Sequence, residues 1–383
     1  MVRYIIALSE LGVKNENLIE LLRNHSSDIV DMFEQSDKDI FEKYLDLMLF
    51  SELFSDKEKI RRGLENADEI LLKNKELNIK TTYYTASTYP KELSVIDNPP
   101  AILYYMGAEF SDVSSKAIAC VGSRNPTRLS YNAINYLVPQ WIKEDCSIIS
   151  GLACGVDKLS HQACISAGGK TVAVLAHGLD TIYPKENISL AERIVESGGI
   201  IMSEYPVGVK ADRFRFVKRN RLIVGLSKVV VIYECDVMGG TMHNAEYAMN
   251  QNKPIFCIDV GEKVMEVQTG TKKLINDKVA EVIRDGRDIF GVLEAVGSQE
   301  FKKRMSAMEV KHNYLHSMLL CMNNSDVLKT TLRDLDINID SQKSAYNSFI
   351  ELVNDNLLNI DELLKVLVDN NIASINKMLA IEE

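Results

Sequence analysis

Phe214-Arg-Phe-Val-Lys-Arg-Asn-Arg221 is the stretch around which this 383-residue chain is organised. It places four cations and two phenylalanines side by side, and a short apolar run lies on each side of it. These runs are Gly199-Ile-Ile-Met-Ser203 and Val229-Val-Val-Ile-Tyr233. Short apolar runs beside glycine-rich turns are typical of a parallel sheet covered on both faces. The pattern therefore predicts a parallel sheet whose strand ends carry a functional site.

Six such runs alternate with helix-like segments at spacings of about 20 to 30 residues, as expected for βα units. We therefore predict an α/β fold with a doubly wound, mostly parallel sheet. Ligands of such sheets bind beyond the carboxyl ends of the strands, so the residues after each run are candidates for the site. The six runs are Ala117–Val121, Ser147–Ser150, Thr171–Ala176, Ile200–Ser203, Val229–Glu234 and Pro254–Ile258.

The placement of proline and glycine predicts three domains. All eight prolines lie between Pro90 and Pro254, and no glycine follows Gly297. Both ends of the chain are rich in good helix formers and poor in turn residues, which indicates helices. We therefore divide the chain into a helical N-terminal domain (1–78), an α/β domain (79–295) and a helical C-terminal domain (296–383).

The net charge of −10 is unevenly distributed. Residues 208–221 hold six cations and one aspartate, whereas both ends of the chain are acidic. A local positive field of this kind favours a polyanionic ligand, and acidic ends limit indiscriminate binding. No apolar run approaches the roughly 20 residues of a membrane span. The seven cysteines include no Cys-x-x-Cys pair, so we expect a cytoplasmic protein without membrane contact and without disulfides.

Glycine turns follow or precede several of the predicted strands. Gly122-Ser-Arg124 follows the first run, Gly151-Leu-Ala-Cys-Gly-Val-Asp157 the second and Met238-Gly-Gly-Thr241 the fifth, while Gly168-Gly-Lys170 precedes the third. Glycines at strand-to-helix turns let backbone N–H groups face an anion. Together with the basic stretch they predict an extended polyanion bound along one rim of the sheet. The dinucleotide and NTP fingerprints are absent, so no cofactor is expected. His312 and His316 lack a third ligand, and no metal site is expected.

Several motifs in the middle of the chain resemble the DNA-processing protein A family (DprA, also called Smf). The resemblance covers residues 80–290 in collinear order. Its pieces are Tyr89-Pro with Asn98-Pro-Pro, Val121-Gly-Ser-Arg124, Ser150-Gly-Leu-Ala-Cys-Gly-Val-Asp157 with His161, Gly168-Gly-Lys-Thr-Val-Ala-Val174, Gly178-Leu-Asp with Tyr183-Pro, Ser203-Glu-Tyr205 and Arg219-Asn-Arg-Leu-Ile-Val-Gly-Leu-Ser227.

The resemblance implies an extended Rossmann-like fold that binds single-stranded DNA, usually as a homodimer, and has no established catalytic step. In that family the protein protects incoming strands and hands them to a RecA-type recombinase during natural transformation. The resemblance also implies a SAM-like N-terminal domain and, at Tyr346–Ile381, the helices of a degenerate winged helix. The DNA-binding residues that we expect are Gly122, Ser123, Arg124, Gly151, Lys170, Arg213, Phe214, Lys218, Arg219, Asn220, Arg221, Gly240 and Thr241.

Each of these residues also has a structural interpretation. Asn220 and Arg221 are equally well explained as groups that hold their loop by bonds to the backbone. Phe214 and Phe216 are more often core residues than stacking platforms for bases, although a stacked base contributes about 1–3 kcal/mol. Asp157 and His161 are expected to cap and orient a helix, because no nucleophile accompanies them.

The sequence also departs from the family and leaves two other functions open. Asn244 stands where the family often has threonine. Gly239-Gly-Thr241 with Glu246 is similar to the pattern of nucleotide-cleaving enzymes of the lysine-decarboxylase-like (LOG) group, although its spacing differs. The unfamiliar segment Phe301–Gln342 and the acidic C-terminal part keep open a nucleotide-sensing or partner-docking module.

Overall fold

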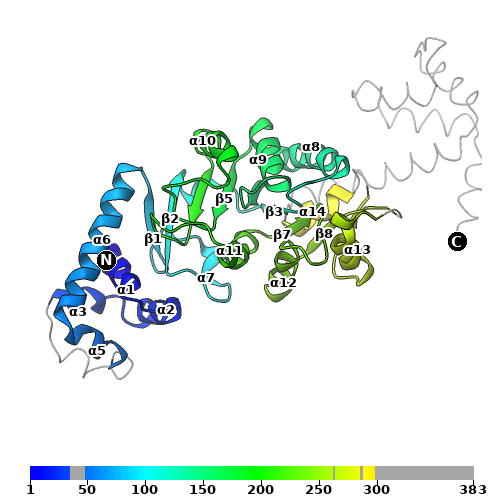
Figure 1. Cartoon of the computed structure of the whole chain (residues 1–383). Coiled ribbons are helices and arrows are strands. Elements are labelled where there is room, and N and C mark those ends of the chain that lie inside the picture. The colour runs from blue at the N-terminus through cyan, green and yellow to red at the C-terminus, as the bar shows by residue number, and fades with distance from the viewer. Residues whose placement is uncertain (35–47, 262–263, 285–287, 298–383) are drawn as a thin grey trace, which may run out of the picture. The chain divides into compact units, whose positions relative to one another are not determined.

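The computed structural model describes residues 1–34, 48–261, 264–284 and 288–297. A sheet of nine strands in the order β1-β2-β6-β5-β4-β3-β7-β8-β9 lies at the centre of this part of the chain (Figure 1). From β6 to β9 in this order, every neighbouring pair is parallel. β2 is antiparallel to β6, and β1 is antiparallel to β2. The strands are β1 (Lys80–Tyr83), β2 (Ile102–Gly107), β3 (Ala117–Val121), β4 (Ser147–Ser150), β5 (Thr171–Leu175), β6 (Ile200–Ser203), β7 (Val229–Ile232), β8 (Ile255–Ile258) and β9 (Glu281–Ile283).

This architecture confirms the predicted α/β fold with a Rossmann-like, mostly parallel sheet. The six apolar runs form β3 to β8, and every residue of these six strands is buried. They are buried because helices cover both faces of the sheet, as the continuous apolar runs require. β1 and β9 were not predicted: they are short, and their residues include exposed side chains.

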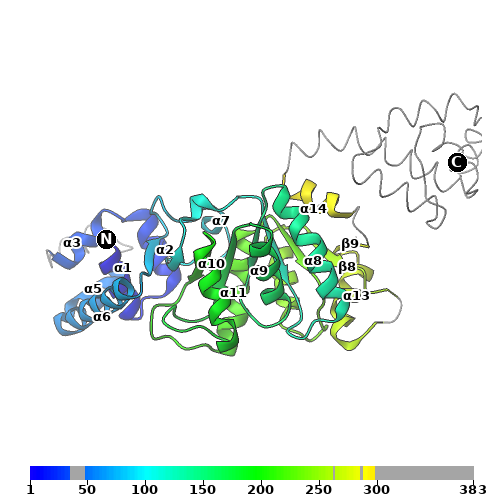
Figure 2. The ribbon, with the colours of Figure 1, turned by 90° about the horizontal axis from the view of Figure 1, so that it is seen from above.

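Helices α8, α9 and α10 cover one face of the sheet, while α11, α12 and α13 lie on the other (Figure 1). Figure 2 looks onto the face that α10, α9 and α8 cover. From β3 the chain adds β4, β5 and β6 in turn on one side, and α11 then returns it to β7 on the other side of β3. The direction of strand addition therefore reverses between β3 and β7. The helices are α8 (Arg128–Lys143), α9 (Val156–Ser166), α10 (Ile188–Glu196), α11 (Arg213–Leu226), α12 (Met242–Asn250) and α13 (Thr269–Asn276).

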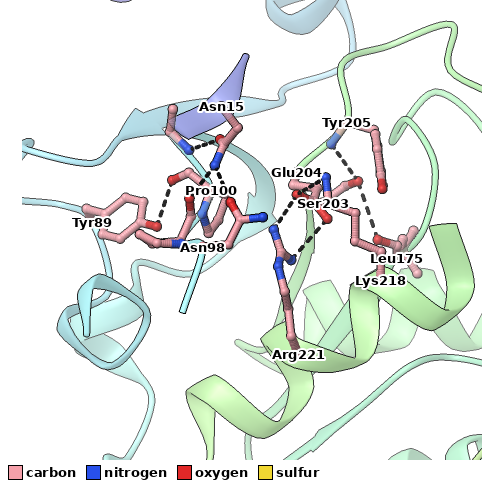
Figure 3. A network of polar contacts seen from close by, with 12 residues as sticks. Asn15, Tyr89, Asn98, Pro100, Leu175, Ser203, Glu204, Tyr205, Lys218 and Arg221 are labelled. Carbon is pink, nitrogen blue, oxygen red and sulfur yellow. Dashed lines mark hydrogen bonds and ion pairs between the residues drawn. The ribbon is translucent and has the colours of Figure 1, made fainter. Parts of the chain in front are cut away.

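The predicted N-terminal helices are present and pack against the start of the sheet domain. Asn15, the first residue of α2, donates to the carbonyl of Pro99 at 2.8 Å and accepts from the Ala101 N–H at 2.8 Å. Tyr89 donates to the Pro100 carbonyl at 2.8 Å, so both sides of the double proline are held in place (Figure 3). The N-terminal helices are α1 (Val2–Glu10), α2 (Asn15–Asn24), α3 (Asp28–Glu34), α5 (Met48–Ser55) and α6 (Lys57–Glu76). The sheet domain also contains α7 (Lys91–Ser94) and α14 (Ile289–Ala295).

Some predictions fall outside the described residues. These are the winged-helix resemblance of Tyr346–Ile381, the segment Phe301–Gln342 and the pair His312 and His316. The division into three domains and the SAM-like character of the first one stay predictions. None of the helices that the structure describes has the length and apolar character needed to cross a bilayer.

His161 on α9 is fully buried. The Thr171 hydroxyl donates to the Ile148 carbonyl at 2.7 Å and therefore accepts from His161 Nδ1, also at 2.7 Å. Burial, together with the charge of Arg219, lowers the pKa of His161 to about 3. The imidazole is thus neutral in the native state, and in this role it fixes the start of β5 to α9.

We expect this buried histidine to make the fold acid-sensitive. An unfolded histidine titrates near pH 6.5, so below that pH the unfolded state binds a proton that the native state refuses. Stability is therefore lost as pH falls from about 6.5 towards 3, and His161 accounts for about 2 kcal/mol between pH 7 and pH 5. Urea unfolding of His161→Asn at both pH values should show a smaller difference than the unsubstituted chain.

The matched control is His243→Asn, because His243 is on the surface of α12 with a side chain that is 42% exposed. It removes a histidine without disturbing a buried contact, so any change in the pH difference should be much smaller than in His161→Asn. An unaltered pH difference in His161→Asn would show that other groups, such as buried His177, cause the acid sensitivity.

Candidate nucleic-acid interface

A pocket of about 280 Å³ opens beyond the carboxyl ends of β3 and β7, where strand addition reverses direction. This is the place at which open α/β sheets bind their ligands. The loop after β3 lines it with Gly122, Ser123 and Arg124, and the loop after β7 lines it with Gly240 and Thr241. Two of the predicted glycine turns therefore meet at one site.

Buried polar contacts fix these two loops against each other. Glu234 at the end of β7 is fully buried, and its carboxylate accepts from the Thr127 N–H at 2.7 Å and from the Thr127 hydroxyl. The Gln268 amide donates to the same carboxylate at 2.7 Å. The Thr241 hydroxyl donates to the Gly122 carbonyl at 3.1 Å and completes the link. The pocket is thus held open by a preformed frame, as ligand sites usually are.

Arg219 connects α11 to the loop after β4 and to the carboxyl end of β5. Its side chain is buried, and Nη1 donates to the Gly151 carbonyl at 2.8 Å and to the Val174 carbonyl. Burial lowers the pKa of Arg219 to about 10, while the nearby charge of Asp157 opposes that shift, so the guanidinium remains charged at neutral pH. Arg219 lines the pocket but is committed to main-chain carbonyls, and its predicted DNA contact stays a prediction.

Asp157 orders the loop on the other side of Arg219. Its carboxylate accepts from the N–H groups of Gly151 and Ala153 at 3.2 and 3.3 Å. These residues precede α9, so Asp157 holds the loop that leads into the helix. Burial raises the pKa of Asp157, and the charge of Arg219 and these backbone bonds counteract the rise.

Arg221 is also buried and is paired with Glu204, just beyond β6 (Figure 3). The two side chains are each 6% exposed, and both guanidinium N–H groups donate to the carboxylate, at 3.1 and 2.7 Å. Lys218 lies 3.6 Å from the same carboxylate but is 45% exposed. Arg221 is therefore held by a side-chain pair rather than by the backbone bonds of its structural interpretation, and its predicted DNA contact stays a prediction. Neighbouring Asn220 is buried, and its amide lies at 3.5 Å from the Gly240 carbonyl.

The exposed part of α11 gathers cations and aromatic rings at the mouth of the pocket. The Arg124 guanidinium lies 5.6 Å from the centroid of the Phe216 ring, and the Tyr183 ring lies 5.9 Å from it. Phe214 is 78% exposed, so the structural interpretation that placed it in the core is wrong, and its predicted DNA contact stays a prediction. The physical reason is its position in the first turn of α11, whose residues are exposed or half-buried. We call Arg124, Tyr183 and Phe216 the aromatic rim; Phe214 lies two residues before Phe216 on α11.

Lys170 does not join this cluster. It directly precedes β5, whereas the pocket lies beyond the carboxyl ends of parallel strands, so Lys170 belongs to the opposite edge of the sheet. Its ammonium donates to the Asp112 carbonyl at 2.7 Å. The single rim that was predicted for all the cations is therefore wrong for Lys170, and its DNA contact stays a separate prediction.

Sequence reasoning missed two features of the site. Tyr183 is 51% exposed and contacts Phe216, and its only sequence signal is a Tyr-Pro pair after a buried strand. Asn244 lines the pocket from the first turn of α12, although the sequence marked it only as a departure from the family. In contrast, Glu246 pairs with His243 at 2.9 Å, is 61% exposed and does not line the pocket. The enzyme alternative that depends on Glu246 therefore gains no support. Among the described residues, no three His, Cys, Asp or Glu side chains could hold a metal ion.

Comparison with known proteins decides the family. A family model described as DNA recombination-mediator protein A matches residues 80–294. The chain belongs to this family. Protein Smf of Synechocystis is 37% identical over 54% of this chain and 52% of its own length, so the match spans about half of that relative. DNA processing protein DprA of Bacillus subtilis is 33% identical over 61% of this chain and 78% of its own length.

Solved structures of two other DprA proteins share the fold. DprA from Streptococcus pneumoniae superposes with a TM-score of 0.60 at 25% identity, over 76% of this chain and 98% of that one. DprA from Helicobacter pylori, whose structure was described for its single-stranded DNA binding mode, gives 0.51 at 30% identity. That match covers 56% of this chain and 96% of the other. The middle of this chain, with its nine-stranded sheet, therefore has the fold of these two proteins, as the resemblance predicted.

We expect any larger residue at position 151 to destabilise the fold, because the Arg219 guanidinium lies against Gly151. A Cβ atom at Gly151 would lie 2.4 Å from one guanidinium nitrogen of Arg219, inside van der Waals contact. We expect Gly151→Ala to displace the guanidinium from its carbonyl partners and to lower the free energy of unfolding by about 1–3 kcal/mol. Gly240→Ala is the matched control, because a Cβ there meets nothing within 4 Å. Equal unfolding midpoints for the two variants in urea would contradict the anchoring role of Arg219.

Proposed function

We propose that this chain is a single-stranded DNA-binding recombination mediator that holds a strand across the aromatic rim. The observation that carries the proposal is the group formed by the Arg124 guanidinium, the Phe216 ring and the Tyr183 ring at the mouth of the pocket. Cations of this kind pair with phosphates, and exposed rings stack on bases. The rings of the rim favour a single strand, because the bases of a duplex already stack on one another.

The exposed cations near the rim support the same ligand. Arg213 and Lys210 are exposed, and Arg215 donates to the Lys210 carbonyl at 2.6 Å while its guanidinium lies 5.3 Å from the Tyr205 ring. These contacts orient the loop before α11 and keep its positive charge beside the pocket. The proposal places phosphates along this loop and at Arg124, and bases against the rings.

Family membership supports a further step in which the bound strand passes to a RecA-type recombinase in transformation or recombination. The homodimer that the resemblance implies and the cytoplasmic location expected from the cysteine pattern belong to the same proposal. Light scattering of the purified chain decides the oligomeric state. Co-purification with a RecA-type protein in the presence and absence of a single strand decides whether the strand mediates the contact.

Arg124→Gln should weaken binding of a fluorescent oligo-dT strand and reduce its salt dependence. Each phosphate that a cation neutralises contributes close to one unit to the slope of log affinity against log salt, so we expect the slope to fall by about 1. Fluorescence anisotropy between low and moderate salt measures both quantities, with duplex DNA of equal length as the reference ligand.

Two further variants that each remove one positive charge accompany Arg124→Gln, the first as its control and the second as a separate test. Arg193→Gln on α10 removes a cation from an exposed helix away from the rim and should change neither the affinity nor the slope. Lys170→Gln tests whether the opposite edge of the sheet takes part in DNA binding. If Arg124→Gln and Arg193→Gln behave alike, the aromatic rim is not the DNA surface.

Phe214→Ala should weaken single-strand binding without affecting the fold. The ring is 78% exposed, so its removal leaves no cavity, and loss of one stacked base costs about 1–3 kcal/mol of binding free energy. The matched control is Leu72→Ala on α6, where a large apolar side chain is 58% exposed away from the rim. Unchanged affinity in Phe214→Ala, measured by the same anisotropy assay, would remove Phe214 from the interface.

A further inference from the structure

The face of the sheet domain that α8 and α9 cover is poor in negative charge. Acidic residues occupy 54 of the 383 positions of the chain, yet none lies between Val113 and Lys143. α8 falls wholly within this stretch, and the one acidic residue of α9, Asp157, is buried. Carboxylates return beyond the end of α8 and on the neighbouring helices α10 and α14. A polyanion over α8 and α9 therefore meets no repulsion from the exposed side chains of these two helices.

Arg128 and Lys158 are unpaired cations on this face. Arg128 is exposed in the first turn of α8, and Lys158 is half-buried in the first turn of α9. Neither side chain makes a hydrogen bond or an ion pair with the residues that the structure describes. Arg219 and Arg221 differ in this respect, because their guanidinium groups are bonded within the fold. A cation without an internal partner, on a surface without carboxylates, is available to an external anion.

Both cations lie beside the loop that carries Arg124. Arg128 follows Arg124 by four residues. The start of α9 packs against the same loop, because the Val156 N–H donates to the Ser123 carbonyl at 3.1 Å. A Cβ atom at Gly155 would lie 2.5 Å from the Arg124 carbonyl, which shows how closely the two loops approach. The aromatic rim therefore continues into a positive surface where α8 and α9 begin.

Tyr131 adds an exposed ring to this surface. It is 52% exposed, and it shares a side of α8 with Ile142, because residues eleven positions apart lie about three helical turns apart. Ile142 lies against the end of α9, since a Cβ atom at Gly169 would be 2.5 Å from its Cδ1. Tyr131 therefore faces the α9 side of α8. Tyr136 is 53% exposed but lies about 140° further around the helix, on the other side.

We propose that the bound DNA strand crosses the carboxyl edge of the sheet at Arg124 and continues over α8 and α9. There Arg128 and Lys158 bind phosphates, and the ring of Tyr131 stacks on a base. The inference rests on the proposed single-strand binding and adds a second contact surface to it. α11 and the helices α8 and α9 lie on opposite faces of the sheet, so the strand is held on both faces (Figure 1).

The length of the DNA strand separates the two surfaces in an experiment. Oligo-dT of about 4 nucleotides occupies the rim, whereas oligo-dT of about 16 nucleotides reaches both surfaces; these lengths span the site sizes of common single-strand-binding folds. We expect Tyr131→Ala to lower the ratio of long-strand to short-strand affinity about fivefold, the lower range for one stacked base. Lys158→Gln should reduce the salt slope of long-strand binding by about 1. Fluorescence anisotropy of labelled strands measures both quantities.

α8 itself supplies the matched controls. Tyr136→Ala removes a ring of nearly equal exposure from the other side of the helix, and Lys143→Gln removes an exposed cation from its far end. Both variants should bind the long strand as the unsubstituted chain does. Tyr131→Phe keeps the ring and should restore the affinity that Tyr131→Ala loses. Equal long-strand affinities of Tyr131→Ala and Tyr136→Ala would overturn the proposal.

The outcomes distinguish this inference from the proposed function. If Arg124→Gln weakens binding of both strands while Tyr131→Ala and Lys158→Gln leave the long strand unaffected, the second surface is excluded and the rim stands. If the unsubstituted chain binds neither strand, the proposed function fails together with this inference. The substituted side chains are exposed or half-buried, so we expect unchanged unfolding midpoints in urea, which exclude misfolding as the cause of a loss.

Discussion

The hydrogen bonds of the Arg219 guanidinium to the Gly151 and Val174 carbonyls are the interaction on which the site depends. They join the long crossover helix α11 to the carboxyl ends of β4 and β5. A cation removed from water is costly unless its hydrogen bonds are satisfied, so this arrangement tolerates little displacement. The tight fit of Gly151 against the guanidinium has the same consequence. Arg219 fixes α11 at this point, and the six residues before it in the helix are exposed or half-buried.

The burial of Arg219 divides the basic stretch of α11 into two parts with different roles. Residues 219–226 of α11 are all buried, while its first six residues are exposed or half-buried. The inner cations, Arg219 and Arg221, bind carbonyls and a carboxylate and hold the framework. The outer ones remain available to solvent beside Arg124. A run of cations is therefore not a measure of the charge that a ligand meets, and a polyanion at this rim meets fewer positive charges than the sequence contains.

The sequence was sufficient to predict the parallel sheet, because buried strands require continuous apolar residues and glycine turns separate these runs. Ala117–Val121 and Ile200–Ser203 coincide with β3 and β6 for this reason. The short edge strands β1 and β9 lack that signal, since only one residue of each is buried. The site was predicted only in part: the meeting of Gly122 and Thr241 follows from strand order, which local sequence does not encode. The burial of Arg219 depends on partners 45 and 68 residues away, and no local pattern indicates it.

The acidic composition of the chain is compatible with a nucleic-acid site that depends less on charge than on surface shape. Several cations near the pocket are already paired or bonded, as Arg221 with Glu204 and Arg215 with a carbonyl show. Phosphate contacts alone would then give weak, strongly salt-dependent binding that does not distinguish strands from duplexes. The exposed rings of Tyr183 and Phe214 add an attraction that only unpaired bases can use. The proposed selectivity for single strands therefore depends on the exposed start of α11, whose buried half is held in place by Arg219.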